Sequence, residues 1–257
     1  MLEVFGMAES LFDMLRCIAC RKPAGIEPLC RSCRQSLIRH AGCGRCGQMG
    51  CPGELDATAA MGAEETIRPT AASPYGKRPC LSGSIDRFFA SYSYEGPARS
   101  MVVELKKTGS PRVAAFCTKE LAGGLWGLVE EGWLVSWIPS ASSSEKGFDH
   151  GEVLARAVSW HLGLAAERLL VRKVPGEAKS LGSRARRHLA KAAIDVVPGR
   201  KLGSYHGILL IDDVATTGAS LVAAADRLKA AGVRSVVAAT VTHTPLYRRE
   251  KKLHWLA

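Results

Sequence analysis

Two adjacent carboxylates, Asp212 and Asp213, carry the clearest chemistry in the sequence. They follow the apolar run 208–211, which has the composition of a short strand covered on both faces of a parallel sheet. A carboxylate pair at the carboxyl end of such a strand can accept hydrogen bonds from two neighbouring hydroxyls, or it can hold a hydrated Mg²⁺. The vicinal hydroxyls of a ribose are a ligand of this kind.

Small and hydroxylated residues come next, before a helical run over 221–231. Backbone N–H groups of such a loop, together with the helix N-terminus, can bind a phosphate. The loop consists of Val214, Ala215, Thr216, Thr217, Gly218, Ala219 and Ser220. A diol site beside a phosphate site predicts a ribose 5-phosphate ligand. In the structural alternative, the aspartates are turn residues and a threonine or Ser220 caps the helix.

The whole stretch 208–220 resembles, at every position, the motif by which type I phosphoribosyltransferases bind 5-phosphoribosyl 1-pyrophosphate (PRPP). The resemblance implies that Asp212 and Asp213 bind the ribose and its Mg²⁺, and that residues 214–220 bind the 5-phosphate. It also implies an α/β fold in which helices flank a parallel sheet.

Cysteines near the N-terminus form a second candidate site. Three C-x-x-C pairs fall within residues 17–46, and such pairs in a chain without an export signal favour structural zinc over disulfides, because cytosolic thiols stay reduced. Proximity groups Cys17, Cys20, Cys30 and Cys33 into one set, and a second set could comprise Cys43, Cys46, Cys51 and Cys80. Interleaved pairing fits the spacing equally well. The sequence therefore predicts a zinc ribbon with one or two Zn²⁺ ions, with a redox role as the competing interpretation.

The loop over 139–150 could bind the anionic part of a ligand. It places Lys146 and Gly147 among small and hydroxylated residues, between a predicted strand and a predicted helix. That composition suits an anion such as the pyrophosphate of PRPP. His150, at the start of the helix, could be a general base, although a cap or a surface position is commoner for such a histidine.

Basic charge is concentrated in two segments. The chain has a formal net charge of +11, which suggests a polyanionic partner or simply a solvated surface. One segment is the predicted zinc ribbon, where Glu27 is the only acidic residue between residues 16 and 51. The other, residues 172–191, contains Lys179 and Arg184 and could cover a polyphosphate or follow a nucleic-acid backbone.

The rest of the sequence predicts how these candidates are arranged. Residues 1–51 would form a helix and the zinc ribbon, 52–83 an irregular Pro- and Gly-containing insertion, and 84–257 the α/β domain. No apolar run is long enough to cross a bilayer, and no secretion signal is evident, so we expect a cytoplasmic protein. Within the α/β domain, strands are predicted at 86–93, 133–138, 169–171, 194–197, 208–211 and 233–241.

The order of these features resembles the ComF family. A basic cysteine array is followed by Leu105-Lys106, by Ile138-Pro139 at a strand end, by the run 146–150, by an Arg-rich segment and by the PRPP motif. The resemblance covers nearly the whole chain and implies a zinc ribbon joined to a type I phosphoribosyltransferase domain. It also implies single-stranded DNA binding and a link to DNA-uptake or helicase machinery. Either the chain binds PRPP in that role, or it is an active transferase that passes the phosphoribosyl group to an unidentified acceptor.

Overall fold

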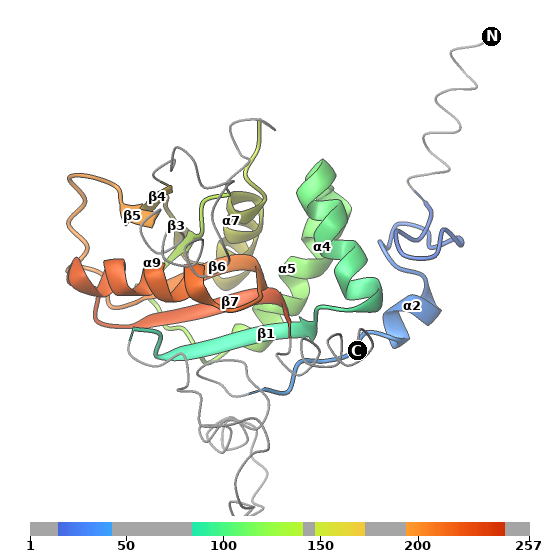
Figure 1. Ribbon diagram of the computed structural model, residues 1–257, viewed down its shortest axis with the longest axis horizontal. Coiled ribbons are helices and arrows are strands. Elements are labelled where there is room, and N and C mark those ends of the chain that lie inside the picture. Colours follow the sequence, from blue (N-terminus) through green and yellow to red (C-terminus); the bar gives the residue numbers. More distant parts are fainter. Residues whose placement is uncertain (1–14, 43–83, 141–146, 173–193, 245–257) are drawn as a thin grey trace, which may run out of the picture.

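The computed structural model describes residues 15–42, 84–140, 147–172 and 194–244. At its centre lies a five-stranded parallel sheet in the order β1-β7-β6-β2-β3 (Figure 1). The strands are β1 (Arg87–Ser93), β2 (Leu134–Trp137), β3 (Ala165–Ala166), β6 (Ile208–Ala215) and β7 (Val236–His243). Every residue of β7 is buried, as expected for a central strand of a sheet covered on both faces.

Helices cover both faces of this sheet. One face carries α4 (Gly96–Thr108), α5 (Pro111–Leu125) and α7 (His150–Leu162), and the other carries α9 (Ala219–Ala230). Side chains of β6 alternate between the two faces, so Leu209 and Ile211 pack with α4, α5 and α7, whereas Ile208 and Leu210 pack with α9. Within the described ranges, no helix combines the length and the apolar character needed to cross a membrane.

The predicted parallel sheet flanked by helices is confirmed, with one difference that affects the site. The strand expected over 208–211 continues to Ala215, because β7 is long enough to pair with it as far as His243. Asp212 and Asp213 are therefore strand residues that face opposite sides of the sheet. The two remaining strands, β4 (Leu170–Arg172) and β5 (Ile194–Val196), form a separate antiparallel pair.

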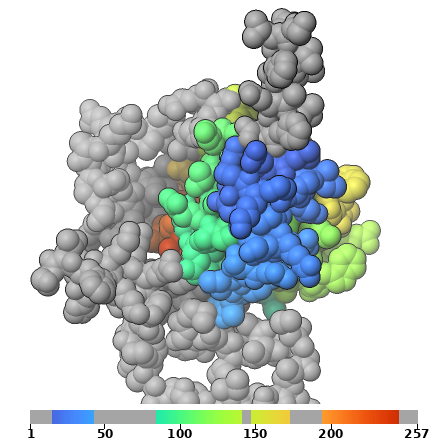
Figure 2. Space-filling model, turned by 90° about the vertical axis from the view of Figure 1, so that its right-hand side faces the viewer, coloured from blue at the N-terminus to red at the C-terminus, as the bar shows by residue number. Residues whose placement is uncertain are grey.

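Residues 15–42, which we call the Cys module, contain the short helix α2 (Arg31–Gln35) and pack against the helices of the domain (Figures 1 and 2). Buried Cys17 and Leu29 belong to the same apolar core as α4 and α5. From the first turn of α5, the guanidinium of Arg112 donates to the carbonyl oxygens of Gly25 and Arg16, at 3.3 and 3.0 Å.

The end of the Cys module also joins the edge of the sheet. The carbonyl of Ile38 accepts from the N–H of Ser93 at 2.9 Å, and an isolated antiparallel bridge pairs Arg39 with Tyr92 of β1. The Tyr92 hydroxyl donates to Glu120 of α5 at 2.6 Å, and the Arg39 guanidinium lies 2.6 Å from the same carboxylate. The predicted insertion over 52–83 falls outside the described residues, so the division into domains stays a prediction.

Candidate functional site

A cavity of about 290 Å³ lies at the carboxyl ends of β2 and β6, where open parallel sheets bind ligands. Its walls come from distant parts of the chain: Lys106, Ile138, Pro139, Ser140, His150, Arg172, Asp212, Asp213, Val214 and Ser220. Both predicted carboxylates and two residues of the predicted phosphate loop therefore line one cavity. The walls also include three basic residues, which gives the cavity charges of both signs.

Asp213 is the buried member of the carboxylate pair. Only 2% of the residue is exposed, and one oxygen, Oδ2, lies 3.0 Å from Nζ of Lys106 and 3.1 Å from Nε2 of His150. Although burial by itself would raise the pKa of Asp213, the hydrogen bond from His150 and the ammonium of Lys106 hold that pKa below its usual value. Asp213 is thus an ionised side chain with two basic partners.

Asp212 has the opposite electrostatic character. It faces the α9 side and is partly exposed, and its Oδ1 accepts from the backbone N–H of Asp213 at 2.9 Å. Desolvation by the surrounding protein, together with the neighbouring Asp213 carboxylate, raises the pKa of Asp212 well above its usual value. Because the raised pKa means that ionised Asp212 is destabilised here, a bound cation or a set of hydroxyl donors would stabilise its carboxylate. The pair is therefore compatible with Mg²⁺ that binds together with a phosphorylated ligand.

The predicted phosphate loop leads directly into α9. Gly218 adopts a left-handed conformation with φ of 66°, and the N–H of Ala219 donates to the hydroxyl of Thr217 at 3.4 Å. Ser220, in the first turn of this 12-residue helix, lines the cavity. The positive end of the helix dipole therefore lies beside Asp212, as an anion site requires. That these residues bind phosphate stays a prediction.

The connection from β2 to α7 closes another side of the cavity. Asp149 caps α7: its Oδ1 accepts from the N–H of Gly151 at 2.9 Å and its Oδ2 from the N–H of Ser140 at 3.0 Å. His150 is buried, with 8% exposed, so the expectation of a cap or surface position was wrong. Of the predicted anion-binding residues, Gly147 is described and has a φ of 70°, and it does not line the cavity. Lys146, Lys179 and Arg184 lie outside the described residues.

A close contact fixes the end of α4 against this connection. Gly109 ends the helix with a φ of 64°, and a Cβ at this position would lie only 3.0 Å from the ring of Phe148. Glycine therefore allows the helix end to approach the segment that carries His150. The approach brings Lys106, in the last turn of α4, to the carboxylate that His150 also contacts.

Lys106 lines the cavity and was not predicted as a site residue. His150 was predicted as a possible general base, and Arg172 only as part of the basic segment 172–191. Arg172, at the end of β4, donates from Nε to the carbonyl of Pro139 at 3.0 Å, which fixes its guanidinium at the rim. Lys106 and Arg172 lie more than 35 positions from the carboxylates in sequence, so spacing carried no signal for them. The signal that could have found Lys106 was its place in the Leu105-Lys106 pair of the family resemblance.

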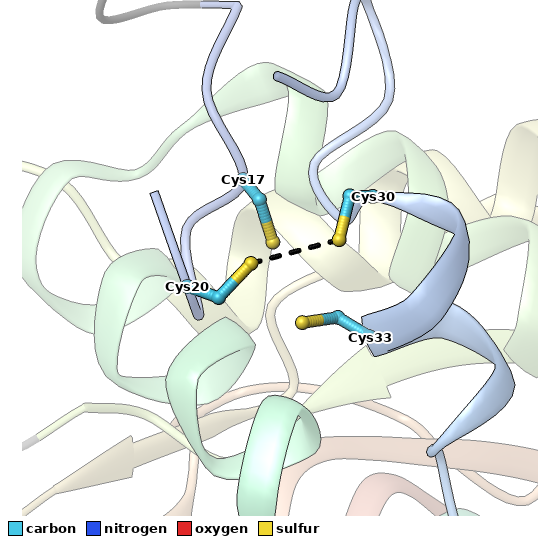
Figure 3. A group of neighbouring side chains, drawn as sticks. All are labelled: Cys17, Cys20, Cys30 and Cys33. Carbon is cyan, nitrogen blue, oxygen red and sulfur yellow. Dashed lines mark hydrogen bonds between the residues drawn. The ribbon is translucent and has the colours of Figure 1, made fainter. Parts of the chain in front are cut away.

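A second candidate site lies in the Cys module. The sulfurs of Cys17, Cys20, Cys30 and Cys33 lie within 4.8 Å of one another, and those of Cys20 and Cys30 are 3.6 Å apart (Figure 3). Four thiolates at about 2.3 Å from a tetrahedral Zn²⁺ would be about 3.8 Å apart, so the cluster fits one structural zinc ion. The first predicted set is thus brought together. Cys43, Cys46, Cys51 and Cys80 lie outside the described residues.

The environment of these thiols shifts their pKa values in both directions: burial and the hydrogen bonds with the other three cysteines raise the pKa of Cys33. Burial by itself would raise the pKa of the Cys17 thiol, but backbone hydrogen bonds at Cys30, Cys20 and Ala19 lower this pKa to about 6. A backbone hydrogen bond at Cys33 likewise lowers the pKa of Cys30. All four positions around the cluster centre are taken by protein sulfurs, which is the arrangement of a structural site and leaves no position for a substrate.

Comparison with protein families gives one match: residues 149–257 match the family model described as "Phosphoribosyl transferase domain". The matched range begins at the cap of α7 and includes β6, α9 and β7. The predicted fold class is confirmed, and what the chain shows of the family is this match over residues 149–257. No curated protein sequence matches the chain.

A search of solved structures matches the allosteric regulatory enzyme of purine biosynthesis, at 19% identity over 49% of this chain and 25% of that one, with a TM-score of 0.35. A hypoxanthine phosphoribosyltransferase from Staphylococcus aureus has 16% identity, coverage of 51% and 64%, and a TM-score of 0.34. An adenine phosphoribosyltransferase from Leishmania donovani has 17% identity, coverage of 60% and 62%, and a TM-score of 0.34. The chain thus spans less than two thirds of each of these proteins.

Proposed function

We propose that the cavity binds PRPP, or a related ribose phosphate, together with Mg²⁺, and that the protein is a ComF-type phosphoribosyltransferase-domain protein. The observation that carries this proposal is the juxtaposition of Asp212 with the N-terminus of α9. A carboxylate binds hydroxyls or a cation, and a helix N-terminus binds a phosphate. A ribose 5-phosphate carries both groups on one small ring, and the matched family model supports the same ligand class.

A titration of Mg²⁺-PRPP, followed by calorimetry, tests this proposal. The wild type is expected to bind, and Asp212→Asn is expected to bind at least roughly tenfold more weakly, because it loses the charge that faces the hydroxyls and the cation. Glu131→Gln is the matched control, since Glu131 is an exposed carboxylate outside the cavity. A folded wild type that binds neither PRPP nor ribose 5-phosphate would refute the proposal.

The same site supports a catalytic alternative, transfer of the phosphoribosyl group. In that reaction a nucleophile forms a bond to C1 of the ribose, and the bond from C1 to pyrophosphate breaks with its electron pair leaving on pyrophosphate. The transition state separates charge, so positioning and cationic groups dominate its stabilisation. Arg172 lines the cavity, and its guanidinium is a cation that could stabilise the departing pyrophosphate. Lys146, Lys179 and Arg184 were predicted for the same role from the sequence. Release of pyrophosphate from PRPP with a panel of acceptors would distinguish catalysis from binding alone.

Binding of single-stranded DNA, with a role in DNA uptake, is the other part of the proposal. Its support is charge: the described part of the Cys module exposes Arg16, Arg21, Lys22, Arg31, Arg34 and Arg39. Exposed arginines and lysines on a small rigid module suit phosphate contacts, and such binding weakens steeply with salt. Fluorescence anisotropy of a labelled single strand at several salt concentrations tests it, with Arg31→Glu expected to weaken binding. Binding that is absent or insensitive to salt would contradict it.

A further inference from the structure

Asp212 and Asp213 are not equivalent, because they face opposite sides of β6. Asp213 shares its side with Leu209 and Ile211, whose neighbours are α4, α5 and α7. Asp212 shares its side with Ile208 and Leu210, whose neighbours include α9. A ligand over the end of β6 therefore meets a different partner on each side: the first turn of α9 on one, and the end of α4 on the other.

On the α4 side, the group that borders the cavity is Lys106. Its side chain is 37% exposed, while its Nζ lies 3.0 Å from Asp213, whose side chain is only 3% exposed. The ion pair with Asp213 fixes the position of this ammonium. His150 contacts the same Oδ2, with its Nε2 at 3.1 Å. A lysine that would otherwise sample many rotamers is thus held at the cavity wall.

We propose that Lys106 binds the pyrophosphate group on C1 of PRPP, and that Asp213 and His150 are positioning residues for it. In this assignment Asp212 binds the ribose hydroxyls and the cation, and the N-terminus of α9 binds the 5-phosphate. This assignment rests on the proposed function, and it divides the predicted carboxylate pair into a ligand-binding member and a supporting member.

Two ligands that differ only at C1 test the assignment: PRPP and ribose 5-phosphate, each titrated in the presence of Mg²⁺. Lys106→Met is expected to weaken PRPP binding at least roughly tenfold, the usual effect of losing a charge-assisted contact, with ribose 5-phosphate changed less than about twofold. Lys107→Met is the matched control, because Lys107 is the next residue of α4 and is exposed outside the cavity. Lys106→Arg should recover part of the PRPP affinity.

The carboxylates provide the second half of the test. Asp213→Asn is expected to reproduce the selective loss of PRPP affinity, because Lys106 loses its anchor, whereas Asp212→Asn is expected to weaken both ligands. Equal losses for both ligands in Lys106→Met or Asp213→Asn would overturn the assignment, as would unchanged PRPP affinity in Lys106→Met. Those results would leave the proposed function intact. A wild type that binds neither ligand would overturn both.

Discussion

The Cys module and the cavity at the carboxyl ends of β2 and β6 are built in opposite ways. The four sulfurs of the module come from residues 17–33, and short backbone turns bring them together. The cavity takes its walls from residues between Lys106 and Ser220, carried by α4, β4, β6, α7, α9 and the connection after β2. One site depends on local geometry, and the other depends on the packing of the whole domain.

The two sites also differ in how their charges are balanced. The thiolates of the module converge on one closed centre that a single Zn²⁺ would neutralise. In the cavity, one carboxylate is paired with basic side chains and the other lies beside a helix N-terminus. The first arrangement stabilises a fold, whereas the second leaves groups available for a ligand. A substitution should therefore affect one site without abolishing the other.

The largest expected effect is that of Cys30→Ser. Removing one of four ligands should release the zinc ion and unfold residues 17–33, because structural zinc contributes on the order of 10 kcal/mol to the folding of such small modules. The sheet should persist, since β6 and β7 are buried independently of the metal. Zinc content and hydrogen exchange, measured on the same samples, check both expectations.

Ser32→Ala is the control for this prediction, because Ser32 lies inside the same C-x-x-C turn and is not a ligand. It should keep both the zinc and the exchange protection of the module. Full zinc occupancy in Cys30→Ser would contradict the four-cysteine site, and loss of protection in β6 and β7 would contradict the independence of the two regions.

The difference between a site built from a short stretch and a site built by the packing of the domain explains which features could be predicted from the sequence alone. The four-cysteine set and the PRPP motif were predictable because the residues of each lie within a short stretch, where spacing sets the geometry. The parallel sheet followed from apolar runs such as 208–211. Lys106 was not predicted, because only the packing of α4 in the folded domain brings it to Asp213. Arg172 was predicted only as part of the basic segment 172–191, because its contact with Pro139 also depends on the fold. The burial of His150 was missed for the same reason.

An intermediate effect is expected for Gly109→Ala, which lies outside the cavity. Alanine at a φ of 64° costs about 1–2 kcal/mol, and its Cβ would lie 3.0 Å from the Phe148 ring, so the ring and the end of α4 must move apart by a few tenths of an ångström. The shift should move Lys106 and weaken PRPP binding while zinc content stays unchanged. Calorimetric titration together with zinc analysis checks this expectation.

Gly163→Ala is a close match for the control. Gly163 ends α7 with a φ of 67°, but a Cβ there would meet nothing within 4 Å. Both substitutions therefore carry the same backbone strain, and only Gly109→Ala carries the contact with Phe148. Equal PRPP affinities in the two variants would show that this contact does not position the site.

The smallest expected effect is on the stability of the ligand-free protein, and its sign differs between the two carboxylates. The pKa of Asp212 is raised in the folded state, so its ionisation opposes folding increasingly as pH rises above the usual value of 3.8 toward the raised value. Asp212→Asn should therefore match the wild type at low pH and melt at a higher temperature near neutrality, since an amide oxygen can still accept from the Asp213 N–H.

The pKa of Asp213 is lowered, so its ionisation favours folding above 3.8, and that contribution is lost as pH falls through the folded value. Asp213→Asn should accordingly melt at a lower temperature near neutrality. Thermal melts between pH 4 and 8 without ligand compare the two, and a stability change of the same sign in both variants would contradict the division of the pair into a ligand-binding and a supporting carboxylate.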